Sequence, residues 1–155
     1  MHIVKKILVG LGGVFLALIA LFFWLAVSSS NFRTQQEPFV KAFVTDLSKR
    51  WDLTDVYGRL ANSFIEQADT AQGRGLMMQL KQLGALQSVR DFELRNYNFA
   101  PKGQTGIFSF KGTFDYGEAV VDVTVIRSGG MVRVQGLHVS APRIREQRTQ
   151  ARSQA

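Results

Sequence analysis

The chain has 155 residues and a formal net charge of +7, with 19 Lys and Arg residues against 12 Asp and Glu residues. It contains no cysteine, which excludes disulfides, thiolate catalysis and cysteine-ligated zinc. Most of the excess charge lies near the ends, because residues 31–142 hold 13 basic and 11 acidic side chains. A nearly neutral domain argues against a nucleic-acid platform, which would concentrate Lys and Arg on its surface.

An uninterrupted apolar segment opens the chain. Residues 7–27 contain no charged residue, no Pro and no Asn or Gln, and Lys5 and Lys6 precede them. As a helix with a rise of about 1.5 Å per residue, this segment matches a hydrocarbon core of about 30 Å. The sequence therefore predicts a transmembrane signal anchor at residues 7–27 behind a cytoplasmic stub at residues 1–6. A cleaved signal peptide is the alternative, because Ala26-Val27-Ser28 resembles a small-x-small cleavage site.

Basic residues on either side of this segment predict its orientation. Lys5, Lys6 and the terminal amine lie before it, and Arg33 is the only basic residue within about ten positions after it. The positive-inside rule then places the N-terminus in the cytoplasm. In a bacterium this is a single-pass protein of the inner membrane with a periplasmic domain. Gly13 and Ala17 would let two such helices pack closely, or are ordinary residues of a membrane helix.

Helical periodicity follows a short polar linker expected at residues 28–37. Apolar residues then recur with helical spacing in three stretches, residues 38–50, 53–68 and 76–83. Pro38 suits the first turn of the first helix. Gln72-Gly73-Arg74-Gly75 is expected to break the pattern before the third helix, and Gly84 suits the position that ends it.

From residue 86 the period changes to two, which predicts four strands. Phe92 and Leu94 alternate while Tyr97 and Phe99 continue on the opposite phase, so a bulge is expected near Arg95-Asn96. A hairpin loop is expected at residues 100–106, a tight turn at residues 128–130 and a second phase shift at Gly136. The aromatic stripe expected in the core consists of Phe108, Phe110, Phe114 and Tyr116.

This order of elements predicts an α+β fold in which three helices pack on one face of a bent, four-stranded antiparallel sheet. It resembles the nuclear transport factor two-like superfamily of cone-shaped, cystatin-like domains. The resemblance lies in Leu83-Gly84-Ala85-Leu86-Gln87-Ser88, in residues 106–116 and in residues 129–134, and it covers residues 37–141. We therefore expect a cone domain at residues 38–141 and a basic, disordered tail at residues 142–155.

Enzymes of this superfamily place an Asp, or a His–Asp pair, inside the cone. Asp115, Asp122 and His138 alternate with apolar residues and are expected to point away from the core, so no catalytic residue is assigned. No metal ligands and no cofactor motif are expected either.

Three aromatic residues with polar tips could line a pocket in the cone or pack in the core with the tip reaching water: Trp51, Tyr57 and Tyr97. The sequence thus favours a non-enzymatic accessory or scaffold of the cell envelope, which contacts the bilayer and an envelope protein or a second copy of itself. A binding module for a small apolar ligand is the first alternative. An isomerase-like or dehydratase-like enzyme is the second.

Overall fold

A computed structural model describes residues 2–141, and the side chains of residues 2–16, 25, 28 and 29 lie outside this description. The expected tail at residues 142–155 and the surroundings of Gly13 therefore lie outside the described part. The chain divides into two compact units, Met1–Gln36 and Glu37–Ala155, and each is described by itself.

The first unit belongs to helix α1 (His2–Ser48), whose apolar side chains at Leu18, Ile19, Leu21, Phe22, Phe23 and Trp24 are exposed. Among the residues whose side chains the structure describes, no helix combines the length and the hydropathy of a membrane span. The polar stretch 28–37, expected as a linker, is helical, and Pro38 lies inside α1 rather than at its start. Proline removes one backbone hydrogen bond, which good helix formers such as Gln35, Gln36 and Glu37 help to offset.

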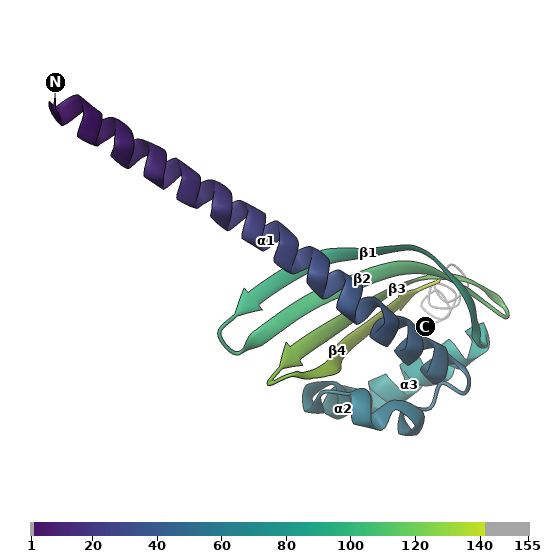
Figure 1. The fold of residues 1–155 in the computed structure, drawn as a ribbon. Helices are drawn as coiled ribbons and strands as arrows, with labels where there is room; N and C mark the ends of the chain where they lie inside the picture. The colour runs from purple at the N-terminus through teal and green to yellow at the C-terminus, as the bar shows by residue number, and fades with distance from the viewer. Residues whose placement is uncertain (1, 142–155) are drawn as a thin grey trace, which may run out of the picture. The chain divides into compact units, whose positions relative to one another are not determined.

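The second unit is α+β, as predicted (Figure 1). Its four strands form an antiparallel meander in the order β1-β2-β3-β4: β1 (Leu86–Ala100), β2 (Gly103–Phe114), β3 (Gly117–Ser128) and β4 (Met131–Ser140). The described residues contain five helices instead of three plus an anchor. They are α1, η1 (Leu53–Arg59), α2 (Asn62–Ala68), α3 (Ala71–Leu80) and η2 (Lys81–Leu83).

Two further helix predictions were wrong, each because of a contact made by the backbone or a cap. The stretch 53–68 is split, because Leu60 forms a parallel bridge with Val134 and the Ala61 amide donates to the Val134 carbonyl at 2.8 Å. These edge contacts with β4 hold the chain extended between η1 and α2. Residues 72–75 do not break the third helix, since Thr70 caps α3 by accepting from the Gly73 amide at 3.0 Å.

The predicted interruptions in the sheet are confirmed, and the predicted hairpin loop is shorter than expected. The β1–β2 register shifts between Leu94 and Asn96, and the β3–β4 register shifts after Thr124, opposite Gly136. Only Pro101 and Lys102 separate β1 from β2. Gly84 has φ +75°, as expected for the residue that ends the helical region.

The core lies between the end of α1 and one face of the sheet (Figure 1). Phe43 and Leu47 are fully buried, as are Phe108 and Phe110, and the Phe92 ring lies 5.5 Å from Phe108 and 5.9 Å from Phe110. The valines on the same face of β3 are also fully buried: Val121, Val123 and Val125. Tyr116 does not belong to this core, because it lies in the turn after β2 and is 63% exposed.

Candidate functional site

Helices η1, α2 and α3 line an open groove with a volume of about 430 Å³, which we call the helical groove. Its apolar lining consists of Trp51, Leu53, Tyr57, Leu60, Ile65, Ala68, Met77 and Met78. Polar and charged side chains complete the lining: Asp52, Thr54, Asp69, Arg74 and Lys81. The groove therefore offers an apolar surface beside charges of both signs.

Trp51 is held between the core and the groove by its backbone and by its indole. Trp51 lies in the turn that follows α1 and has φ +51°, and its amide donates to the Leu47 carbonyl at 2.6 Å. The indole Nε1 donates to the Gly84 carbonyl at 2.9 Å, and the ring lies 5.9 Å from the Phe114 ring. Trp51 is only 3% exposed, so its polar tip bonds to the backbone rather than to water.

The structure brings two of the three predicted pocket residues together. Trp51 and Tyr57 both line the helical groove, and the Tyr57 side chain is exposed there. Tyr97 lies on β1 opposite Gly106 and does not line this groove. Met77 and Met78, which the sequence assigned only to a helix, add two flexible thioether side chains, and Met78 is 70% exposed.

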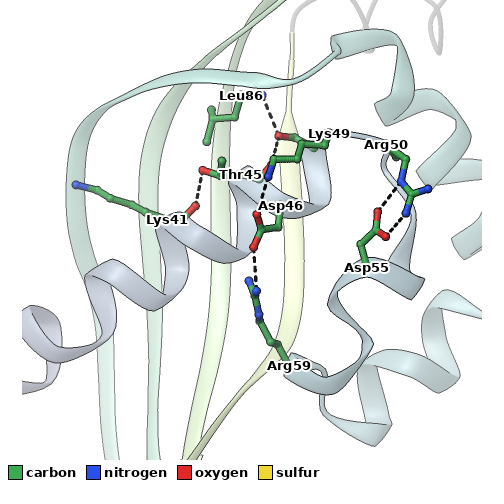
Figure 2. Close-up of polar contacts among 9 residues, drawn as sticks. Lys41, Thr45, Asp46, Lys49, Arg50, Asp55, Arg59 and Leu86 are labelled. Carbon is green, nitrogen blue, oxygen red and sulfur yellow. Dashed lines mark hydrogen bonds and ion pairs between the residues drawn. The ribbon is translucent and has the colours of Figure 1, made fainter.

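Charged side chains hold η1, one wall of the groove, against the end of α1 (Figure 2). Asp46 accepts from Lys49 at 3.1 Å and from Arg59 at 2.8 Å, and these two hydrogen bonds lower the pKa of its carboxyl. Arg50 makes two contacts with Asp55, one of them from Nε to Oδ2 at 2.9 Å.

Asp52 begins η1 as its N-cap. Its Oδ1 accepts from the Thr54 amide at 2.9 Å, and this backbone hydrogen bond lowers the pKa of the carboxyl. The lowered pKa keeps Asp52 negatively charged. Since Asp52 also lines the helical groove, this charge faces any occupant of the groove.

A second cavity, of about 690 Å³, lies between α2, α3 and the sheet, and we call it the sheet cavity. Apolar residues of α2 and α3 line it, including Phe64, Leu76 and Leu80. From the sheet come Ile107, Asp122, Thr124, Gly136, Leu137 and His138. It is therefore a larger space than the groove, with an acid, a hydroxyl and an imidazole among its lining groups.

A row of polar residues crosses all four strands, and two of its members, Asp122 and His138, line the sheet cavity. Register places Glu93 opposite Ser109, Ser109 opposite Asp122, and Asp122 opposite His138. Arg95 links the row, with Nε 3.9 Å from Glu93 Oε1 and Nη1 4.0 Å from Asp122 Oδ1. Among the described residues, the buried Asp122 Oδ1 has no hydrogen-bond partner.

Sequence reasoning did not find the pairing of Asp122 with His138. The Gly129-Gly130 turn pairs Ser128 with Met131, and regular counting from this pair would put Asp122 opposite Leu137. The one-residue shift after Thr124 puts His138 there instead. Alternation along β3 and β4 was the available signal, and it shows only that both side chains leave the core face.

Among the side chains that the structure describes, no group of three His, Asp or Glu residues could hold a metal ion. Comparisons with protein-family models, with curated proteins and with solved structures gave no match for this chain. The helical groove and the sheet cavity are therefore the two features from which a function is inferred.

Proposed function

We propose that this chain is a single-pass membrane protein whose second unit is a non-enzymatic binding domain of the cell envelope. In this proposal the helical groove accepts an apolar side chain of an envelope partner protein. The observation that carries the proposal is the groove itself, an open apolar surface with exposed Tyr57 and Met78 at its edge.

The anchoring part of the proposal rests on the N-terminal sequence. Residues 7–27 are apolar throughout, and Lys5 and Lys6 precede them. Large apolar side chains at residues 18–24 are exposed along α1, and the acyl chains of a bilayer would cover them. The N-terminus then lies in the cytoplasm and the second unit outside it, in the periplasm of a bacterium.

The fold part of the proposal is the cone of the nuclear transport factor two-like superfamily. Three features support it: the order of helices before strands, the antiparallel meander and the register shifts in β1 and in the β3–β4 pair. Such shifts bend strands and increase their twist, which lets a sheet curve around helices.

The lining of the groove favours a protein partner as its occupant. A cavity of about 430 Å³ has room for an aromatic or branched side chain together with its neighbours on a partner, and Met77 and Met78 can adapt to its shape. The charged lining contains both signs, with Asp52 and Asp69 against Arg74 and Lys81. Asp69 and Arg74 lie 3.3 Å apart as an ion pair, so a partner could orient itself by competing for either charge.

Site-specific photocrosslinking of the full-length chain in its native membranes tests this proposal. A photoreactive amino acid at Met78 should give one predominant protein adduct, and Tyr57→Asp should strongly reduce it. Tyr116, similarly exposed but outside the groove lining, is the matched control position and should give no such adduct. Equal adducts from both positions, or an adduct at Met78 that Tyr57→Asp leaves unchanged, would contradict the groove assignment.

The sheet cavity favours a second candidate function, the binding of a small apolar ligand. Its volume and its polar lining groups, among them Asp122, Thr124 and His138, are those of a ligand pocket. Gly136→Leu would place a side chain beside Thr124 and fill part of this space, whereas Gly58→Leu lies in open space and serves as the control. Native mass spectrometry of the full-length chain should show a retained small molecule that Gly136→Leu alone removes. Its absence from the parent chain would contradict this second function.

A further inference from the structure

The two hairpin turns β1–β2 and β3–β4 lie side by side at one end of the sheet, and the β2–β3 turn lies at the other end (Figure 1). Ser128 Oγ donates to the Lys102 carbonyl at 2.9 Å and joins the two turns. Gly103 allows their close approach, because a Cβ there would lie 2.5 Å from the Arg127 carbonyl oxygen. The two turns therefore form one preorganised surface.

Two large apolar side chains project from this end. Phe99, near the end of β1, is 53% exposed, and Met131, the first residue of β4, is 60% exposed. Single exposed apolar residues are ordinary on protein surfaces. Here, however, the two flank turns that a hydrogen bond joins, and the strand register places Phe99 on the face of the sheet that carries Val125 and Met131 on the opposite face. Each face of the sheet therefore carries one exposed apolar side chain at this end.

The charge around these two residues has one sign. Residues 94–107 and 123–137 contain Arg95, Lys102, Arg127 and Arg133 and no Asp or Glu. Arg95 lies deeper in the sheet, near Glu93 and Asp122, so three basic residues surround the turns. Acidic residues lie toward the opposite end of the sheet, including Asp115 and Glu118. Arg90 and Lys111 also lie toward that end, paired with Glu118 and Asp91, so the charge of the sheet changes along its strands from wholly basic to mixed.

We propose that the hairpin-tip surface, which consists of Phe99, Lys102, Arg127, Met131 and Arg133, binds the surface of a bilayer that contains anionic lipid. The end of the sheet meets the bilayer edge-on, so that Phe99 from one face and Met131 from the other enter the interface between headgroups and acyl chains. The three basic side chains approach the lipid phosphates. A bilayer with anionic lipid offers both negative headgroups for the basic side chains and an apolar layer for Phe99 and Met131. The charge of an acidic peptide would match only the basic side chains. The inference rests on the membrane anchoring in the proposed function, because an anchored domain stays within reach of a bilayer.

The absence of cysteine makes single-site labelling of the full-length chain straightforward. Three labelled variants are compared in nanodiscs of phosphatidylcholine with or without phosphatidylglycerol: Met131→Cys at the tip, Tyr116→Cys at the opposite end and Phe22→Cys in the anchor. Each carries a polarity-sensitive fluorophore, and nitroxide-labelled lipid serves as the quencher. Tyr116 is the matched control because it is 63% exposed, close to the value for Met131.

The expected result is strong quenching at Phe22→Cys in both lipids, and at Met131→Cys a several-fold increase when phosphatidylglycerol is present. Tyr116→Cys should remain unquenched, and Lys102→Glu with Arg133→Glu should abolish the lipid dependence at position 131. If the anchor label is quenched while positions 131 and 116 behave alike, the inference is overturned and the anchoring stands. If the anchor label is not quenched, the anchoring fails and the inference fails with it.

Two further outcomes at position 131 would also overturn the inference. Equal quenching in both lipid mixtures would show a contact that does not depend on anionic lipid. A tip label that lipid does not quench but that is shielded from aqueous iodide would show a protein on this surface instead.

Discussion

The helical groove and the sheet are held in different ways, although both belong to the second unit. The sheet is held by ladders of backbone hydrogen bonds, of which the one between β2 and β3 is unbroken, and by fully buried side chains such as Phe108 and Val123. The wall of the groove formed by η1 depends instead on side-chain contacts, chiefly Asp46 with Arg59 and Arg50 with Asp55 (Figure 2). Substitutions in the core of the sheet should therefore lower the stability of the whole domain. Substitutions in the contacts of η1 should instead change the shape of the helical groove.

The largest expected effect comes from truncating the core beneath the sheet. Phe108→Ala removes a fully buried ring that contacts Phe92, and the loss should be about 3–5 kcal/mol of unfolding free energy. Denaturant titration of the full-length chain in detergent micelles measures this loss. Phe99→Ala, which truncates a half-exposed ring on β1, is the control and should cost well under half as much. Similar costs for the two would show that this core is not what stabilises the domain.

A pair of glycines in α3 tests the junction between α2 and α3, which both cavities share. A Cβ at Gly73 would lie 2.5 Å from the carbonyl oxygens of Gln67 and Ala68, so Gly73→Ala should shift this junction and destabilise the domain by about 1–3 kcal/mol. Gly75 has open space around it, and Gly75→Ala should stabilise the helix by up to about 1 kcal/mol. Opposite signs in thermal unfolding are the expected outcome, and destabilisation of equal size by both would contradict it.

The smallest expected effect concerns the ion pair that holds η1. Asp46 and Arg59 are each about one-third exposed, so Asp46→Asn should cost no more than about 1 kcal/mol of unfolding free energy. It should nevertheless loosen η1 and reduce the photocrosslinking yield at Met78. Arg90→Gln, which removes an exposed ion pair with Glu118 on the sheet, is the control and should leave that yield unchanged.

The same contacts predict a dependence on pH. The pKa values of Asp46 and Asp52 are lowered from the usual 3.8, so their stabilisation is present above about pH 4 and is lost as the pH falls through the lowered values. The unfolding free energy of the parent chain should therefore fall below about pH 4. Asp46→Asn should fall less over the same range, and an identical profile would show that Asp46 does not contribute.

Periodicity in the sequence was enough to predict the α+β class, four antiparallel strands, the bulge beside Asn96 and the end of the helical region at Gly84. These features depend on neighbours within a few residues, where alternation and the conformational freedom of glycine act directly. The buried face of β2 followed in the same way, except at Tyr116, where the strand had already ended.

Other features depend on residues that lie far apart in the chain, and only the tertiary structure decided them. The bridge between Leu60 and Val134 interrupts a helix that local periodicity predicts as continuous. A single extra residue in β4 brings His138 opposite Asp122, and packing of three short helices joins Trp51 and Tyr57 but not Tyr97 in one groove. Local sequence specifies the face of the helix or strand on which a side chain lies. Edge pairing, strand register and helix packing determine which other side chains become its neighbours.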